Sequence, residues 1–187
     1  MRGYVKVARA DAQERTRTAL IDAATRIFLD EGWESTSLQA VAAEAGVTKQ
    51  TLLRHFGSKE GLAEAAFARA MDEASAHRSQ APPGDVEGSV DNLLDHYEAL
   101  GDRAVRLEAM QGGATTADFV QRGREFHYAW VDHAFGPFLT GHDRQRRRAA
   151  LIALCDVHTW RLLSRHLGLS RDEVRATLLL AIRGVIA

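Results

Sequence analysis

The sequence contains almost none of the residues that build cross-linked or membrane-embedded proteins. Its 187 residues include one cysteine, Cys155, which excludes an internal disulfide framework and any zinc or iron–sulfur site with several cysteine ligands. No apolar run approaches the roughly 18 residues that a membrane-spanning helix needs, and residues 1–10 are too polar for a signal peptide. We therefore expect a soluble cytoplasmic protein that does not bind membranes.

Residues that break helices are also scarce. The chain has 3 prolines, of which Pro82 and Pro83 are adjacent, and it is rich in alanine, leucine, arginine and glutamate. This composition favours an all-α fold. Hydrophobic residues make up 45% and charged residues 26%, as in globular chains, and the length suits one large domain or two small ones.

The net charge of −1 argues against a nucleic-acid-binding protein, but the local distribution of charge is uneven. Residues 1–17 contain five arginines and lysines against two acids, and residues 46–59 contain three against none. Screening confines each surface charge to about 8–10 Å, so a binding face depends on its local charge. Excesses this small are common on ordinary solvated surfaces, and charge alone favours that interpretation.

The first third of the chain has the spacing of a long helix followed by two short helices. Apolar residues repeat at helical intervals in residues 11–31, and Gly32 stands where a helix ends. Two further segments, residues 38–45 and 49–56, are separated by Gly46. Two short helices that are joined by a glycine turn and packed against a third helix form a helix-turn-helix unit.

The second short segment has the character of a helix that reads DNA. Thr48 is a candidate N-cap, while Leu52 and Phe56 are four residues apart and share one apolar face. The opposite face carries Lys49, Gln50, Leu53 and Arg54. Glutamine pairs bidentately with adenine, and lysine or arginine pairs with guanine in the major groove. We therefore expect this segment to be a recognition helix.

These residues resemble the TetR family of bacterial transcriptional regulators over about residues 20–62. The matching elements are Ile21-x-x-Ala24-x-x-x-Phe28, Gly32, Thr36-Ser37, Val41-Ala42-x-x-Ala45-Gly46-Val47-Thr48, Leu52, His55-Phe56 and Lys59-Glu60-x-Leu62. The resemblance implies an all-α protein with an N-terminal three-helix DNA-binding domain, expected at residues 10–58. A larger helical bundle at residues 59–187 would then serve dimerisation and ligand binding.

The resemblance also implies which residues meet DNA. They are Ser37, Thr48, Lys49, Gln50, Thr51, Leu53, Arg54, His55 and Lys59. Ser37 and Lys59 begin helices, whose free N–H groups suit phosphates. Leu53 stands where family members usually have a tyrosine that contacts a phosphate, so it either touches a thymine methyl or packs under the first or fourth helix. Gln50 is bulkier than is usual at its position and is the leading candidate for operator specificity.

The rest of the chain is predicted to be helical with short connections. Helices are expected at about residues 59–77, 86–100, 103–111, 115–138, 149–167 and 171–186, with a break at Gly136-Pro137. Gly101 is expected to end the second of these, and Thr115 or Thr116 to cap the fourth. Ser170 is expected to cap the last helix.

The last two expected helices are apolar on two faces, so neighbours must cover both faces. A single large core would do this, but the resemblance favours a homodimer formed by a four-helix bundle from two subunits. The residues assigned to that interface are Leu151, Leu154, His158, Leu162, Val174, Leu178 and Ile182. A two-fold dimer doubles the base contacts and implies a palindromic operator of double-stranded DNA.

A small-molecule effector is a further implication of the resemblance. The candidate ligand-binding residues are Tyr97, Met110, Phe126 and Trp130, because small-molecule sites are mostly apolar with few polar groups. Such residues at helical spacing also occur in plain cores. An effector that binds only the conformation without DNA would lower operator affinity by a population shift.

An enzyme is the first rival interpretation. The sequence lacks His-Glu-x-x-His, Walker and G-x-S-x-G motifs, and its eight histidines are scattered. We therefore expect no catalytic residues, no metal and no cofactor. A helical protein-interaction or ligand-binding module without DNA binding is the other alternative. The prediction favoured over both is a TetR-like repressor that a small molecule releases from its operator.

Overall fold

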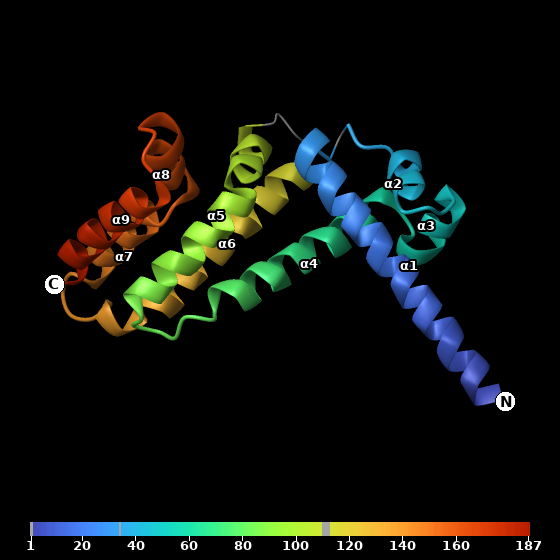
Figure 1. The fold of residues 1–187 in the computed structure, drawn as a ribbon, viewed down its shortest axis with the longest axis horizontal. Helices are drawn as coiled ribbons and strands as arrows, with labels where there is room; N and C mark the ends of the chain where they lie inside the picture. Colours follow the sequence, from blue (N-terminus) through green and yellow to red (C-terminus); the bar gives the residue numbers. More distant parts are fainter. Residues whose placement is uncertain (1, 34, 110–112) are drawn as a thin grey trace. The chain divides into compact units, whose positions relative to one another are not determined.

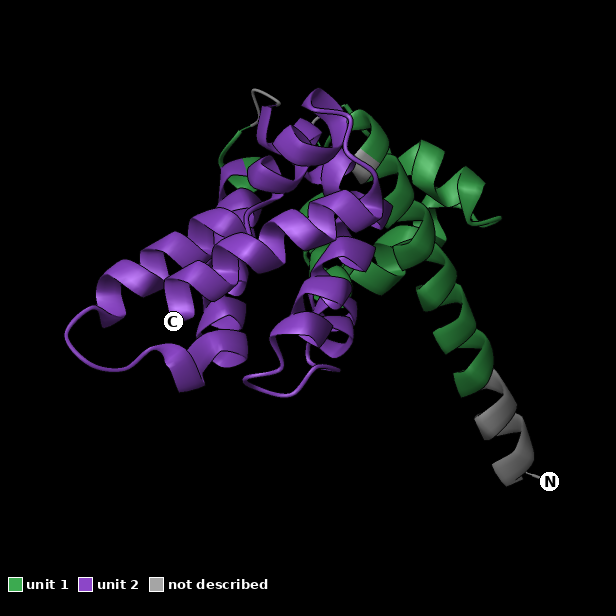
Figure 2. Cartoon of the chain, turned by 60° about the vertical axis from the view of Figure 1, so that its left-hand side comes forward, with its two compact units in different colours: residues 1–70, 110–116 green, residues 71–109, 117–187 purple. Residues whose placement is uncertain are grey.

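The computed structural model describes residues 2–33, 35–109 and 113–187, with side chains from Ala10 onward except Leu29. All regular secondary structure in the described residues is helical, which confirms the all-α prediction (Figure 1). The chain divides into two compact units (Figure 2). The first comprises residues 1–70 and 110–116, and the second comprises residues 71–109 and 117–187. Among the described residues, no helix is long and apolar enough to cross a membrane.

The first unit is built from α1 (Arg2–Glu31), α2 (Leu38–Glu44), α3 (Lys49–Phe56) and the first part of α4 (Lys59–Arg78). Helices as short as α2 and α3 are not stable alone in water, so packing must hold them. Fully buried side chains from all four helices form the core: Leu20 and Ala24 of α1, Val41 of α2, Leu52 of α3 and Leu62 of α4.

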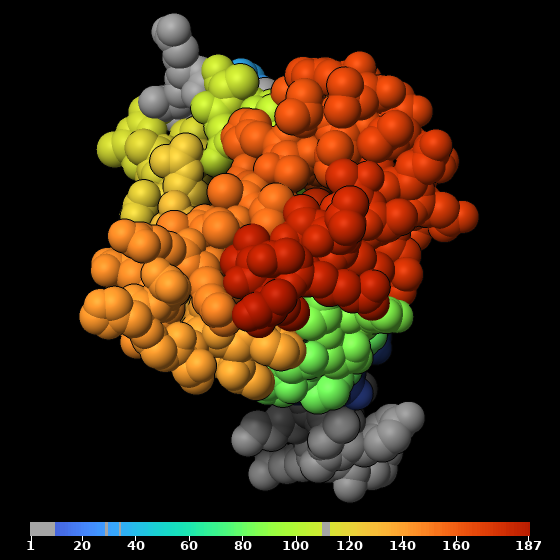
Figure 3. Space-filling view, turned by 90° about the vertical axis from the view of Figure 1, so that its left-hand side faces the viewer, coloured from blue at the N-terminus to red at the C-terminus, as the bar shows by residue number. Residues whose placement is uncertain are grey.

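The second unit contains the end of α4 and a bundle of further helices. These are α5 (Val86–Ala109), α6 (Ala114–Phe135) from Ala117 on, the short 3₁₀ helix η1 (Gly136–Phe138), α7 (Arg144–Leu154), α8 (Val157–Arg161), the π-helical turn η2 (Leu162–His166) and α9 (Arg171–Ile186). Their core includes Leu94, Phe135, Leu151, Trp160 and Ile182. On the face shown in Figure 3, the dark red α9 lies between α7 and the segment of α8 and η2.

Gly101 does not end a helix, contrary to the prediction of two helices at residues 86–100 and 103–111. Helix α5 runs without a break from Val86 to Ala109. A Cβ atom at Gly101 would lie 2.5 Å from Cζ3 of Trp160, which is 2% exposed. The glycine therefore permits α5 to approach the indole ring of α8 closely.

In place of the single helix predicted at residues 149–167, the structure has three helical elements, α7, α8 and η2. Helix α7 already begins at Arg144 and ends at Leu154, because Asp156 has extended backbone angles and starts a new helix. The Asp156 carboxylate accepts a hydrogen bond from the backbone N–H of His158 at 2.8 Å, as an N-cap does. The short α8 then passes into the π-helical turn η2.

Two predicted helix starts have different outcomes. Helix α6 begins at Ala114, so Thr115 and Thr116 lie in its first turn and do not precede it as caps. Helix α9 begins at Arg171 as predicted, and Ser170 forms a capping box with Glu173. The Ser170 hydroxyl accepts from the Glu173 N–H, and the Glu173 carboxylate accepts from the Ser170 N–H at 2.8 Å.

Ion pairs join α5 to α9 along the edge of the second unit. Arg175 donates to both carboxylate oxygens of Asp91, at 2.6 and 3.0 Å, and Arg171 donates to Asp95 at 2.6 Å and to Glu98. The hydrogen bond from Arg175 is the main cause of a lowered pKa at Asp91. The acids of α5 are thus neutralised by the arginines of α9.

The close approach at Gly101 predicts that Gly101→Ala destabilises the protein. The added methyl group must displace a buried indole, which costs about 1–3 kcal/mol, while alanine gains about 1 kcal/mol in helix propensity. We expect urea unfolding to show a net loss of about 1 kcal/mol, and of about 2 kcal/mol at most. Gly123→Ala in α6 is the matched control, since a Cβ there has no heavy atom within 4 Å. A loss of stability in the control, or none at Gly101, would contradict this explanation.

The Asp91–Arg175 pair predicts a pH-dependent contribution to stability. A carboxyl with a lowered folded-state pKa stabilises the fold above its ordinary pKa of 3.8, and this contribution is lost as the pH falls through the folded-state pKa. We expect Asp91→Asn to lower the melting temperature at pH 7, and we expect this difference from the wild type to shrink as the pH is lowered below 3.8. Asp72→Asn, at an exposed position of α4, should not change the melting temperature at any of these pH values. Melting curves over this pH range would contradict this explanation if the difference in melting temperature between Asp91→Asn and the wild type does not shrink in acid.

Candidate nucleic-acid interface

The segment from α2 to α3 is fixed by two N-cap side chains and a glycine turn. The Ser37 hydroxyl accepts a hydrogen bond from the Ala40 N–H at 3.1 Å, and the Thr48 hydroxyl accepts from the Thr51 N–H at 3.2 Å. Between the helices, Gly46 has a φ of +69°, a conformation that favours glycine. The predicted caps and the helix-turn-helix arrangement are therefore present.

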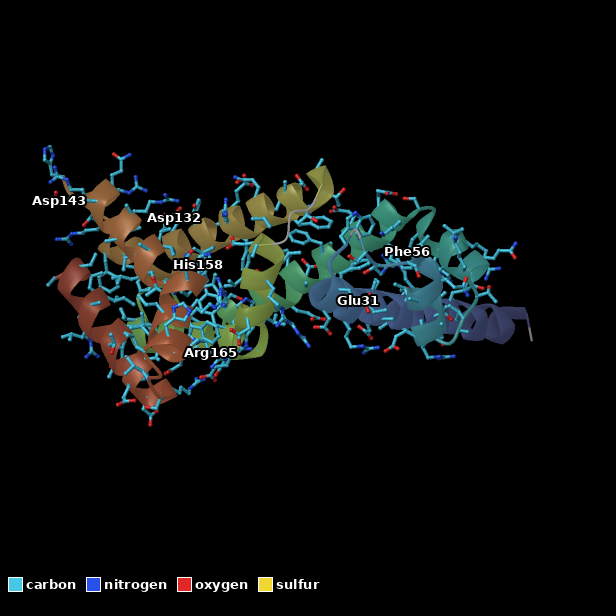
Figure 4. All side chains as sticks on the ribbon, turned by 90° about the horizontal axis from the view of Figure 1, so that it is seen from above. Glu31, Phe56, Asp132, Asp143, His158 and Arg165 are labelled. Atoms are coloured by element: carbon cyan, nitrogen blue, oxygen red, sulfur yellow. The ribbon has the colours of Figure 1, made fainter. Side chains whose placement is uncertain are left out.

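Helix α3 has one face in the core and one in solvent. Leu52 is fully buried and Phe56, labelled in Figure 4, packs against the same cluster, as predicted from their spacing. Lys49, Gln50 and Arg54 are all exposed. Their exposure is the condition that a recognition helix must meet, since base edges can only be read by side chains that face solvent in the free protein.

Leu53 lies on the outer side of α3. It is half-buried but does not belong to the hydrophobic residues that pack against the core of the first unit. Together with Gln50, Thr51 and Arg54 it borders a shallow, open hollow. Of the two roles left open by the sequence, this position supports contact with a thymine methyl over packing under a neighbouring helix.

Positive charge around α3 comes from two further helices. Residues 46–59 carry Lys49, Arg54 and Lys59 and no acid. The Lys59 Nζ lies 4.5 Å from the centre of the Trp33 ring, an arrangement that orients the ammonium group by a cation–π interaction. Arg17 of α1 was not among the predicted site residues, although the basic excess in residues 1–17 pointed to this segment. Its guanidinium lies 5.5 Å from the Phe56 ring at the end of α3.

The start of α4 already holds a carboxylate. The pKa of Glu60 is lowered, first by a hydrogen bond from its own backbone N–H and then by the Ser58 hydroxyl. Ser58 also accepts from the Gly61 N–H at 3.1 Å and so caps the helix. A phosphate at this helix end would lie beside an anion, and the adjacent Lys59 is the group that could offset the repulsion.

The remaining predicted DNA-contacting residues lie near this face. Ser37 and Thr48 are exposed, while Thr51 and His55 are half-buried. The His55 ring lies 6.1 Å from that of Phe56. The prediction that these residues contact DNA stays a prediction.

Three of the four predicted ligand-binding residues lie close together in the second unit. The rings of Tyr97, Phe126 and Trp130 lie around the guanidinium of Arg78, which was not among the predicted site residues. Arg78 gave no signal in the sequence because it stands among polar residues at the end of a helix. The fourth predicted residue, Met110, lies outside the described residues.

The predicted interface residues need a correction. Leu151, Val174, Leu178 and Ile182 are 0–1% exposed in the core of the second unit, so their side chains hold the subunit together and do not form a surface. Three others are accessible to different degrees: Leu154 is half-buried, His158 is exposed and bonded to Glu108 at 2.7 Å (Figure 4), and Leu162 is 49% exposed. Leu167 and Leu180, which were not assigned to the interface, are also exposed.

Cys155, the one cysteine of the chain, is buried. Burial raises the pKa of the Cys155 thiol to about 12, so the thiolate is not formed at neutral pH. Among the described residues, histidines, cysteines and acids do not gather in a group of three that could hold a metal ion.

Comparison with known proteins agrees with the geometry of α2 and α3. Residues 20–66, from the middle of α1 to the first turns of α4, match the family model for bacterial regulatory proteins of the tetR family. Over these residues the chain resembles the TetR family. The match includes every predicted DNA-contacting residue.

Curated HTH-type regulators are similar to part of the chain. The HTH-type transcriptional regulator UidR of Escherichia coli K12 is 33% identical over 101 residues, 52% of each chain. An HTH-type transcriptional repressor from Streptomyces coelicolor is 30% identical over 119 residues, 62% of this chain and 60% of its own. The chain thus spans about half the length of the curated relatives it matches.

The fold of the whole chain resembles solved TetR-family structures. A TetR-family transcriptional regulator from a Rhodococcus species aligns with a TM-score of 0.70 at 23% identity, and the alignment covers 93% of this chain and 100% of that one. This similarity extends beyond the matched N-terminal residues into the second unit, where it concerns the fold alone.

Proposed function

We propose that this protein is a sequence-specific DNA-binding transcriptional regulator, and that it acts as a repressor. The observation that carries the proposal is the two-sided α3, which buries Leu52 and exposes Lys49, Gln50 and Arg54. This helix lies within the segment that matches the TetR family model. The relative from Streptomyces coelicolor is itself named a repressor.

In the proposed complex, α3 enters the major groove of double-stranded DNA. Gln50 pairs with an adenine, Lys49 and Arg54 pair with guanines, and Leu53 packs against a thymine methyl. Ser37, Lys59 and Arg17 approach phosphates on either side and fix the register of the protein on the duplex. The same proposal gives supporting contacts to Thr48, Thr51 and His55.

The proposed division of labour follows the expected domains. Residues 10–58, which lie within the first compact unit, bind DNA, and residues 59–187 bind the effector and form the homodimer. A small molecule that binds only the DNA-free conformation then releases the operator by a population shift. The proposal includes no catalytic activity, metal or cofactor.

Exposed leucines in the second unit support dimerisation. Leu162 of η2 is 49% exposed, Leu167 directly after η2 is 61% exposed, and Leu180 of α9 is 77% exposed. Helices η2 and α9 pack against each other. Large apolar side chains that remain accessible in one subunit are a common feature of surfaces that a partner covers. A two-fold dimer presents two copies of α3 to a palindromic operator.

The proposed base contacts predict the effect of two substitutions on DNA binding. Lys49→Ala and Gln50→Ala each remove a contact worth about 1–3 kcal/mol, so affinity should fall about 5- to 150-fold. Gel shifts with DNA from upstream of the chain's own gene would measure this. Gln145→Ala, at an exposed position of α7, is the control and should bind as the wild type does. Unchanged binding by both α3 variants would show that these residues do not read the DNA.

The proposed dimer predicts that Leu180→Asp yields folded monomers. A carboxylate at the centre of an apolar interface stays unpaired, and its desolvation opposes association. Light scattering coupled to gel filtration would report the mass, with Ala129→Asp at an exposed site of α6 as the control.

The operator itself gives a second test of two-fold binding. Moving the half-sites by about 5 base pairs, half a helical turn, should abolish tight binding by the wild type, because the two copies of α3 then face opposite sides of the duplex. Retention of the dimer by Leu180→Asp, or tight binding to the altered spacing, would overturn the dimer proposal.

A further inference from the structure

Arg78 is a buried cation without an anion. It is the last residue of α4 and is 3% exposed. Its Nε and Nη1 atoms have no hydrogen-bond partner, and no carboxylate of the described residues forms an ion pair with it. Burial without an ion pair is unusual, because arginine is almost never fully buried unless it is paired.

Aromatic rings from α5 and α6 surround the guanidinium. Its Cζ lies 5.3 Å from the centre of the Tyr97 ring, 5.4 Å from that of Phe126 and 5.0 Å from that of Trp130. Cation–π attraction offsets part of the lost hydration. The Tyr97 hydroxyl oxygen accepts a hydrogen bond from the guanidinium, but an aromatic ring is no acceptor in the guanidinium plane, so the donors at Nε and Nη1 have no partner.

Two neighbouring groups also have unused hydrogen-bonding capacity. Trp130 Nε1, a donor, and His127 Nδ1 are buried without partners. The His127 Nε2 lies 3.1 Å from the Ile152 carbonyl oxygen, which can only accept, so Nε2 carries the proton and Nδ1 is an unused acceptor. The His127 and Trp130 rings stack with their centres 6.0 Å apart, which makes the unused groups one continuous cluster with Arg78.

The residues of the cluster carry a net positive charge, and the acid whose charge acts on them is Asp156, which favours higher pKa values at Tyr97 and His127. Burial first, and then the charge of Arg78, lower the pKa of His96 to about 3. Burial also lowers the pKa of His127, with a smaller contribution from Arg78. Both imidazoles are therefore neutral at physiological pH, and neither balances nor adds to the charge of the guanidinium.

These observations identify the chemistry of the missing partner. A carboxylate can accept hydrogen bonds from the guanidinium and from the indole N–H, and its neutral body can pack against the aromatic rings. A phosphate dianion would bring a second negative charge for which the cluster has no cation. A hydroxyl on the same molecule could donate to His127 Nδ1.

We propose that Arg78 binds the carboxylate of a small organic acid with an aromatic or apolar body, and that this site, formed by Arg78, Tyr97, Phe126, His127 and Trp130, is the effector site. The second part of the inference rests on the proposed function, while anion binding itself does not. In this proposal, Arg78 is a buried ligand-binding residue, and its role is not to hold helices together.

The test measures ligand binding by the full chain without DNA. The probes are benzoate, 3-hydroxybenzoate and 3-phenylpropionate, each paired with its neutral amide, at up to about 10 mM, ten times the Kd of about 1 mM expected for fragments of this size. We expect at least one acid to raise the melting temperature and to change tryptophan emission with increasing concentration, while its amide has little effect. Equal responses to acid and amide, or no response to any acid, would overturn the proposal.

Variants of Arg78 distinguish a receptor from a structural residue. Arg78→Met should abolish the response to the acids, a loss of affinity of about 30-fold or more, and should melt at or above the temperature of the unliganded wild type. Arg78→Lys keeps the charge and should retain a weakened response, which tests the site even if the methionine variant folds poorly. A structural role for Arg78 would give a different pattern. Arg78→Met would then be strongly destabilised, while Arg78→Lys and Arg78→Gln would respond to the acids as the wild type does.

Gel shifts without ligand test whether the protein binds operator DNA, independently of whether it binds an organic acid. Arg78→Met should bind operator DNA as the wild type does, and the active acid should release only the wild-type complex. If no variant and no wild-type protein binds DNA, the proposed function fails while the acid-dependent melting shift still stands. If DNA is bound but the acid does not release it, the anion site is not an effector site.

Discussion

The burial of Leu52 is the interaction on which the candidate DNA-binding surface depends. Helix α3 has eight residues and is too short to persist alone, so its orientation comes from the contact of Leu52 with side chains of α1, α2 and α4. With that side chain fixed, the helical period decides which residues face outward. Loss of this single contact would remove the exposed face of α3 without changing any residue that is predicted to contact DNA.

The parts of the fold that depend on local sequence were predictable, and the parts that depend on tertiary approach were not. Ser37, Thr48 and Ser170 act as caps because a hydroxyl reaches the N–H of a residue three positions on, which the sequence alone encodes. Gly101 has the local character of a helix end, yet its role is set by Trp160, almost sixty positions away. Asp156 interrupts a helix that apolar spacing alone would continue, because its cap competes with the helical pattern.

The same distinction separates the two candidate sites. The exposed face of α3 lies within eight consecutive residues, so the helical periodicity and the residue types of this one segment were enough to predict it. The Arg78 cluster joins α4, α5 and α6, and an arginine at a helix end resembles an ordinary solvated side chain until its neighbours are known. Apolar periodicity also could not separate the core of a subunit from a dimer surface, because Leu178 and Leu180 differ in exposure only through what packs against them.

The overall charge of −1 is compatible with binding to a polyanion because the acids and bases are sorted in space. In the second unit, Asp91, Asp95 and Glu98 of α5 are paired with arginines of α9, which leaves little net field at that edge. Residues 46–59 have cations and no acid, so the face of α3 keeps a positive field within the screening length. Leu53 adds an apolar surface to that face in place of a phosphate donor. In the proposed complex, a face built in this way would lose one salt-dependent phosphate contact and gain a contact with a base, which would favour sequence discrimination over affinity.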